Sequence, residues 1–141
     1  DLGEGARVFE WPHAEQAAAK QAAVAKILKG AGLEVELPIH TGEPWGYRNR
    51  MDFAVHDGGV GLRRKGDYKS ILPVRRCLLA LPRINAVLEE LWAWFEQEKA
   101  EIDPYSVARQ VGTVKYAVVR AAKQGNASVS FVIAAWKAAG S

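Results

Sequence analysis

The sequence contains a single cysteine, Cys77, among its 141 residues. One thiol cannot form an intrachain disulfide, and a multi-cysteine metal site cannot be assembled from this chain alone. The three histidines, His13, His40 and His56, are widely separated and lack the spacing of a metal-binding motif. Zinc fingers and zinc ribbons are therefore excluded, and no metal site is predicted.

Long apolar runs and catalytic motifs are also lacking. No stretch approaches the roughly 20 consecutive apolar residues of a membrane span, and residues 1–10 lack the basic-then-apolar order of a signal peptide. We find no Ser or Cys elbow and no glycine-rich loop between a strand and a helix, so no catalytic residue is predicted. We expect a soluble cytoplasmic protein without membrane contact, in which residues 1–141 form a single domain.

Two segments have helical patterns. Residues 13–30 are rich in Ala, Lys and Gln and end in the stop signal KGAG, but their apolar stripe is thin, so this helix should lie against a surface. The second segment follows Pro82, which suits a first helical turn. Its apolar residues recur at helical spacing: Ile84, Val87, Leu88, Leu91 and Phe95. Trp92 and Trp94 lie on the same helix, where a core role is favoured over a ligand site.

The remaining segments alternate with period two and predict two hairpins. The first runs from Tyr47 through the turn HDGG to VGLRRK, and the second joins TVKYAVVRA to ASVSFVIAAW through KQGN. The order helix, hairpin, helix, hairpin predicts an α+β fold, in which an antiparallel β-sheet of two hairpins has helices packed on one face.

Charge follows the same division. Residues 48–76 carry 8 basic and 3 acidic side chains, and residues 104–141 carry 5 basic side chains and no acidic one. The two stretches that contain the helices have net charges of −3 (residues 1–47) and −4 (residues 77–103). Because the basic stretches coincide with the hairpins, we expect one positive face that suits a polyanion.

The candidate RNA contacts are the basic side chains of the first hairpin and its flanks, together with two residues that can hydrogen-bond or stack on an unpaired base. They are Tyr47, Arg48, Asn49, Arg50, Arg63, Arg64, Lys65, Lys69, Arg75 and Arg76. Composition alone is equally compatible with solvated surface charges that pair with the acidic helices.

Several ordered blocks resemble the RNA (uracil-5) methyltransferase family. EPWGYRNRMDFAV and GVGLRRKGDYKSILPVRRC resemble two consecutive blocks of that family, and GTVKYAVVRAAKQGNASVSFVI is similar to a later one. The segment AEQAAAKQ resembles part of the family's connecting helix, so that the blocks cover most of residues 14–134. The block from Tyr47 to Cys77 carries most of the specificity.

The resemblance implies that the parent protein uses S-adenosylmethionine to methylate a folded RNA, which we expect to be ribosomal, and does not bind DNA. It also implies that this chain is the central RNA-binding domain, whose partner is a catalytic domain that 141 residues cannot also contain. Cys77 matches one ligand position of an iron–sulfur cluster found in many members, but the segment GEGARVFEWPHAEQ has no cysteine. We therefore expect no cluster and no cofactor in this chain.

Two other interpretations stay open. Trp11, Trp45 and Trp136 lie at element edges, which is compatible with ordinary packing or with a seam against another domain. The chain would then be an interdomain docking module with little RNA contact of its own. A small self-contained enzyme ranks last, because the sequence offers no candidate acid or base.

Overall fold

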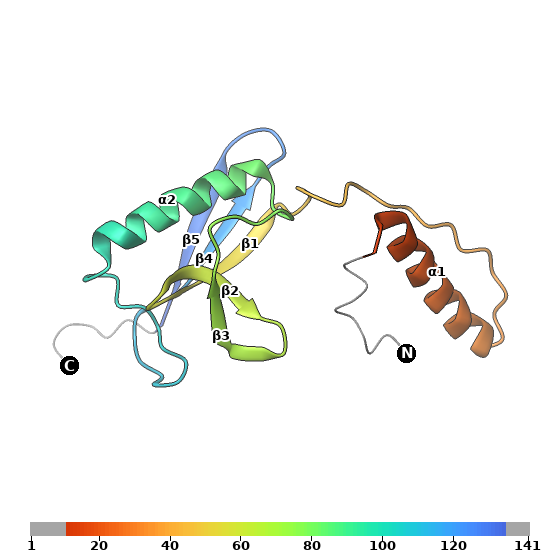
Figure 1. Ribbon diagram of the computed structural model, residues 1–141, viewed down its shortest axis with the longest axis horizontal. Coiled ribbons are helices and arrows are strands. Elements are labelled where there is room, and N and C mark those ends of the chain that lie inside the picture. The colour runs from red at the N-terminus through yellow and green to blue at the C-terminus, as the bar shows by residue number, and fades with distance from the viewer. Residues whose placement is uncertain (1–10, 135–141) are drawn as a thin grey trace. The chain divides into compact units, whose positions relative to one another are not determined.

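The computed structural model describes residues 11–134, whose secondary structure comprises two helices and five strands (Figure 1). The chain divides into two compact units, Asp1–Pro44 and Trp45–Ser141. The expectation of one domain over residues 1–141 stays a prediction, and Trp136 lies outside the described residues.

Among residues 11–44 of the first unit, the structure has one helix, α1 (His13–Gly30), which confirms the helix predicted there. No residue of α1 is buried, and Ile27 is 71% exposed. This exposure agrees with the thin apolar stripe of the helix. The segment after the helix returns along it, because the Gln21 side-chain amide donates a hydrogen bond to the Leu37 carbonyl. Because none of its residues is buried, α1 forms no hydrophobic core.

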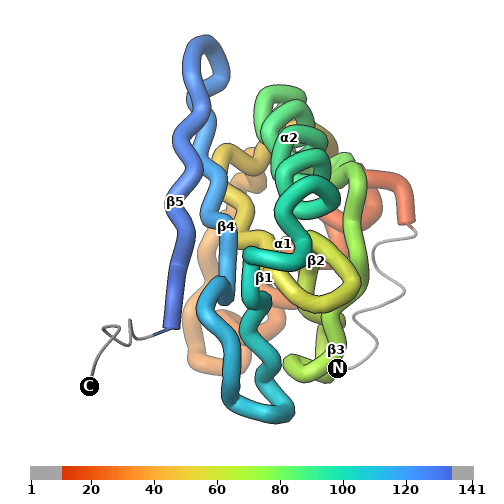
Figure 2. Tube along the Cα trace, turned by 90° about the vertical axis from the view of Figure 1, so that its left-hand side faces the viewer, coloured from red at the N-terminus to blue at the C-terminus, as the bar shows by residue number. Residues whose placement is uncertain are grey.

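The second unit is built on a five-stranded antiparallel sheet. Its strands are β1 (Arg50–His56), β2 (Gly59–Arg64), β3 (Asp67–Pro73), β4 (Val114–Ala121) and β5 (Ala127–Ile133). They are arranged in the order β3-β2-β1-β4-β5, so that β1 and β4 join the two hairpins (Figure 2). Both predicted hairpins are confirmed.

The strand β3 is absent from the sequence prediction. A turn after Arg64, in which Gly66 has a φ of 80°, reverses the chain and lets Leu72 lie opposite Leu62 on β2. Most of β3 is exposed. Its weak apolar pattern therefore gives little sequence signal, and hydrogen bonding to β2 defines the strand.

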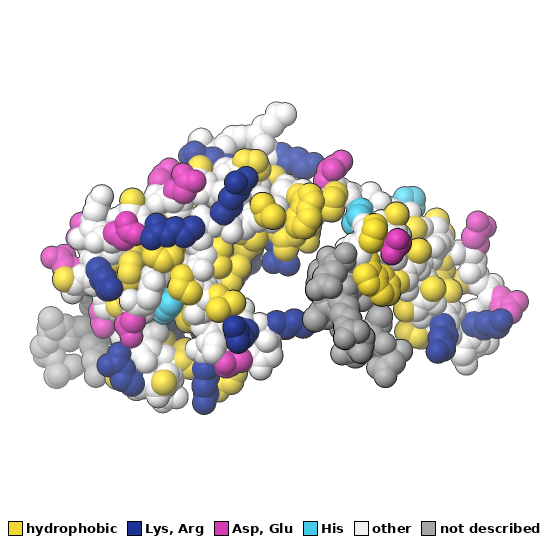
Figure 3. Space-filling view, viewed as in Figure 1, with side chains coloured by type: hydrophobic (Ala, Val, Ile, Leu, Met, Phe, Trp, Pro, Cys, Tyr) yellow, Lys and Arg dark blue, Asp and Glu magenta, His cyan; other side chains and the backbone are white. Residues whose placement is uncertain are grey.

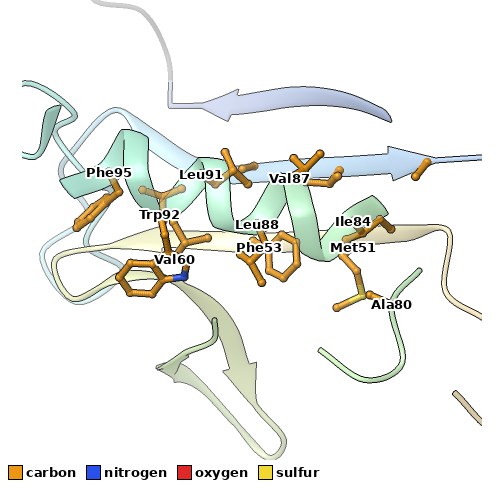
Figure 4. Packing of buried hydrophobic residues seen from close by; sticks show 14 of the residues in the cluster. Met51, Phe53, Val60, Ala80, Ile84, Val87, Leu88, Leu91, Trp92 and Phe95 are labelled. Carbon is orange, nitrogen blue, oxygen red and sulfur yellow. The ribbon is translucent and has the colours of Figure 1, made fainter. Parts of the chain in front are cut away.

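One face of the sheet is covered by α2 (Pro82–Glu98), which confirms the predicted second helix. The apolar stripe of α2 packs on the inward side chains of β1, β2 and β4 (Figure 4). Phe53, Val60, Ile84, Leu88 and Val119 are fully buried there. The predicted packing of helices on one face is thus observed for α2, whereas α1 belongs to the first unit.

Trp92 anchors α2 to the β1–β2 hairpin. Its indole N–H donates a 2.8 Å hydrogen bond to the Val74 carbonyl, and its ring forms an edge-to-face contact with Phe95 at 6.2 Å. The ring lies over Gly59, where a Cβ would come within 2.1 Å of it. Because Gly59 also has a φ of 123°, both space and backbone conformation require glycine at this position. The core role predicted for Trp92 is confirmed.

Candidate nucleic-acid interface

The face of the sheet opposite α2, called the open face below, carries the polar side chains. Successive strand residues point to opposite faces, so Arg50 and Asp52 lie opposite the buried Met51 and Phe53 of the same strand. Cross-strand partners share a face, which places Arg120 beside Arg50 in the register of β1 and β4. Two cationic side chains from different hairpins therefore meet on the open face.

Arg50 is held by the carboxylate of Asp52. Its Nε and Nη2 donate hydrogen bonds of 2.8 and 2.9 Å to the two carboxylate oxygens. The hydrogen bond from Arg50 lowers the pKa of Asp52, and the charge of Arg120 acts in the same direction. Both side chains of the pair remain about half exposed. The guanidinium of Arg50 is oriented by the pair but still accessible.

Arg63 is also engaged, but with neutral groups. Its Nε and Nη2 donate hydrogen bonds of 2.9 and 2.6 Å to the Tyr116 hydroxyl, and its Nη1 donates one to the Tyr68 carbonyl. The guanidinium carbon lies 5.4 Å from the centre of the Tyr116 ring. Arg63 thus connects β2, β3 and β4, which gives it a structural role on the open face.

Arg75 lies against α2. Its Nη2 contacts the Glu96 carboxylate at 2.6 Å, and its guanidinium stacks 3.9 Å from the centre of the Trp92 ring. Because both partners belong to the helix, Arg75 is on the helix side of the unit and not on the open face. The expectation that basic side chains gather on one face does not extend to this residue.

The other predicted residues are exposed and distributed over several segments. Tyr47 and Arg48 precede β1, where the Arg48 N–H donates to the Leu79 carbonyl at 2.8 Å. Arg64 and Lys65 lie at the β2–β3 turn, Lys69 on β3 and Arg76 just after β3. Basic and acidic side chains are interspersed over the visible face of the second unit (Figure 3). RNA contact by each of the ten residues stays a prediction.

The structure places a hollow at the end of the open face where β1 begins, β4 ends and β5 begins. Its volume is about 560 Å³. Its lining comprises Asn49, Arg50, Arg120, Ala121, Ala122, Asn126, Ala127 and Ser128. Two of these residues, Asn49 and Arg50, are candidates from sequence, and the structure adds polar groups from the second hairpin. Two guanidinium groups, two amides and a hydroxyl line the hollow, and such a set can bind an anion together with a hydrogen-bonding group.

Three polar residues of this hollow, Arg120, Asn126 and Ser128, are missing from the sequence prediction. The excess of basic residues after position 103 is a signal for Arg120, whereas the turn KQGN accounts for Asn126 without a binding role. The antiparallel pairing of β4 with β5 brings Ser128 opposite Arg120. This pairing is a long-range feature that no local pattern specifies.

A second hollow, of about 500 Å³, has the opposite character. Its lining includes Trp94, Glu98, Glu101 and Asp103. The ring of Trp94 also contacts Phe131 of β5 at 5.0 Å between ring centres. Carboxylates repel a polyanion, so the hollow on the open face is the better candidate for a nucleic acid.

Cys77 lies partly buried beside the core. Its backbone N–H and carbonyl both bind the side-chain amide of Asn85, at 2.8 and 3.0 Å. Within residues 11–134, no group of three or more His, Cys, Asp or Glu side chains could hold a metal ion. Neither described helix is long and apolar enough to cross a membrane. The expectation about an iron–sulfur cluster stays a prediction.

No family model matches the sequence. The chain is 32% identical over 108 residues to a tRNA (uracil(54)-C(5))-methyltransferase of Pyrococcus furiosus, covering 76% of this chain and 26% of that protein. It is 38% identical over 79 residues to an uncharacterized RNA methyltransferase of Leptospira interrogans, covering 55% of this chain and 17% of that protein. The chain thus spans about a quarter of the length of the first of these relatives.

A solved structure matches the fold. The crystal structure of Pyrococcus abyssi tRNA (uracil-54, C5)-methyltransferase in complex with S-adenosyl-L-homocysteine superposes with a TM-score of 0.75 at 26% identity. The match covers 92% of this chain and 31% of that structure.

Residues 11–134 do not fit S-adenosylmethionine. All strand pairs of the five-stranded sheet are antiparallel, and the sheet offers no strand, glycine-rich turn and helix of the kind that holds such a cofactor. Sequence and fold together show that the chain is homologous to one part of the RNA methyltransferases that act at C5 of uracil.

Proposed function

We propose that this chain is the RNA-binding part of an S-adenosylmethionine-dependent RNA (uracil-5) methyltransferase, and that it is inactive by itself. The observation that carries the proposal is the open face of the sheet, on which Arg50 and Arg120 meet beside a hollow lined by amides and a hydroxyl. Cofactor binding and methyl transfer belong to another domain of the parent protein, which we expect to be cytoplasmic.

The chemistry of the open face suits RNA. Arginine forms bidentate hydrogen bonds with phosphate, and its planar face can also stack on a base. Tyr47, which is 52% exposed just before β1, offers a ring for stacking. The face is backed by α2, whose acidic residues Glu89 and Glu90 are exposed. The RNA would therefore approach from the side opposite the helix.

The class of RNA has two candidates. The family resemblance implies ribosomal RNA, whereas the Pyrococcus furiosus relative is a tRNA methyltransferase by name. Both are folded RNAs with unpaired loops, in which a protein can reach the base edges. We retain ribosomal RNA as the expectation and make tRNA the competing substrate in the experiment.

Binding to RNA is tested by titrating the chain with a tRNA transcript and with a ribosomal RNA hairpin at several salt concentrations. We expect affinity to fall steeply with salt, since bound phosphates release counterions. The double variant Arg48→Gln with Arg50→Gln should bind several-fold more weakly. Arg83→Gln, with one charge removed on α2, is the control and should bind like the unchanged protein. Salt-independent or absent binding would contradict the proposal.

A docking module with little RNA contact is the second candidate. It is favoured by exposed apolar residues on β5, where Phe131 is 46% and Ile133 45% exposed, and by Trp45 at 61%. Such surfaces are typical of contact with another domain. This candidate predicts that the Arg48 and Arg50 substitutions leave RNA affinity unchanged.

A further inference from the structure

Arg50 and Arg120 lie directly opposite each other on adjacent strands. Like charges in this position repel and destabilise the sheet, unless an anion compensates them. Asp52 compensates Arg50 through two hydrogen bonds. Among the residues that the structure describes, Arg120 has no ion pair within 4.0 Å. The charge of Arg120 is therefore available to an anion from outside.

The surroundings of Arg120 add neutral hydrogen-bonding groups. Ser128 lies opposite Arg120 in the register of β4 and β5, and Asn49 and Asn126 line the same hollow. Within residues 11–134, the side chains of these three residues make no hydrogen bond to protein. Two amides and one hydroxyl therefore lie around the guanidinium of Arg120, and all three can donate and accept hydrogen bonds.

The remaining lining of the hollow is small and apolar. Ala121, Ala122 and Ala127 leave a space of about 560 Å³, which falls within the roughly 300–1,000 Å³ of small-ligand sites. Ala121 is 7% exposed and is fixed by the hydrogen bond from its N–H to the Asn49 carbonyl at 2.9 Å. Ala121 belongs to the core cluster and Ala127 packs against it, so these small residues border the hollow on the side of the core.

We propose that this hollow binds one unpaired nucleotide of the RNA. Arg120 and Ser128 hold its phosphate, and the amides of Asn49 and Asn126 hydrogen-bond the edge of its base. This inference rests on the proposed function and deepens it, because it assigns the ligand of one hollow. An amide both donates and accepts, so it pairs with a base edge that only an unpaired nucleotide exposes.

The inference is tested with an RNA hairpin that has a single-stranded loop and with a duplex of the same length. We expect Arg120→Gln to weaken binding of the loop RNA roughly tenfold and to reduce the salt slope by about 0.7, the value for one single-strand phosphate. Arg83→Gln, the control, removes one positive charge from α2. It should change both the affinity for the loop RNA and the salt slope less than Arg120→Gln does.

Asn126→Ala tests the base contact separately. It should weaken binding of the loop RNA several-fold, leave the salt slope unchanged and leave duplex binding unaffected, because no phosphate contact is removed. Urea unfolding of every variant checks that the fold is retained.

The outcomes distinguish this inference from the proposed function. If the unchanged chain binds RNA with the expected salt dependence, but Arg120→Gln and Arg83→Gln behave alike, the nucleotide site is wrong and the proposed function stands. Equal loss of loop and duplex binding in Asn126→Ala would overturn the base contact. Absence of RNA binding by the unchanged chain would overturn both.

Discussion

The two faces of the sheet are built from the same strands, yet they differ in almost every physical property. The face under α2 is a continuous apolar core in which Phe53 and Val60 are fully buried. The open face carries Arg50, Asp52 and Arg120, which stay accessible. Stability is therefore concentrated on one face, so that the other can hold polar groups for a ligand.

The difference is sharpest between neighbours on β1. Phe53 is fully buried, whereas the side chain of the adjacent Asp52 is 47% exposed. Given this division between the two faces, substitution of Phe53 should change mainly the free energy of unfolding, and substitution of Asp52 should change mainly the affinity for RNA.

The largest change in the free energy of unfolding is expected from substitutions on the face of the sheet that α2 covers. Phe53→Ala should lower the free energy of unfolding by about 3–5 kcal/mol, since a large buried side chain is lost and a cavity remains. Urea unfolding followed by circular dichroism measures it. Should this variant not fold, Phe53→Leu provides a milder test at about 1 kcal/mol. A change for Phe53→Ala no larger than that for Asp52→Asn would contradict the division.

An intermediate effect on the free energy of unfolding is expected where Trp92 of α2 contacts the segment after β3. Trp92→Phe leaves the Val74 carbonyl without its 2.8 Å hydrogen bond and weakens the stacking of Arg75. The free energy of unfolding should fall by about 1–3 kcal/mol. Trp94→Phe is the matched control, because the Trp94 indole N–H donates no hydrogen bond to another of the described residues. Equal losses for the two variants would show that the hydrogen bond contributes nothing.

The smallest effect on stability is expected on the open face. Asp52 has a pKa below its ordinary value of 3.8, chiefly because of the hydrogen bond from Arg50. A lowered pKa contributes stability that is present above the unfolded-state pKa and is lost as the pH falls through the folded-state value. Asp52→Asn should therefore reduce the loss of melting temperature on acidification below about pH 4.

Asp52→Asn should also increase the affinity for RNA a few-fold at neutral pH, because it releases Arg50 and removes one negative charge. Asp67→Asn, at an acidic position on β3 outside the hollow, is the control for the change in net charge. If the two variants bind RNA equally well, the pairing of Arg50 with Asp52 has no special part in binding.

Much of this fold was predictable from local patterns. The helix α2 and the two hairpins correspond to clear periodicities, such as the apolar series from Ile84 to Phe95. The helix α1 was predictable from its Ala, Lys and Gln content and its glycine stop signal. The strand β3 was missed because it is an exposed edge strand, in which Tyr68 is 65% exposed. A strand of this kind is defined by its hydrogen bonds to β2, and these are absent from the local pattern.

The candidate site was less predictable. Sequence identified Asn49 and Arg50, but it treated Arg75 in the same way, although Arg75 contacts Glu96 and Trp92 on α2. Charge counts show how many cations a segment carries, but they do not show where each guanidinium points. The direction depends on strand register and on the partner that lies within reach.

The sequence by itself determined the α+β class, the apolar stripe of α2 and the two basic hairpins, because each of them follows from local periodicity or composition. Only the tertiary structure decided that β1 and β4 are neighbours, which places Arg120 beside Arg50 and brings Asn126 and Ser128 to the same hollow. Residues 70 positions apart in the chain become partners only through the long-range hydrogen bonds of the sheet.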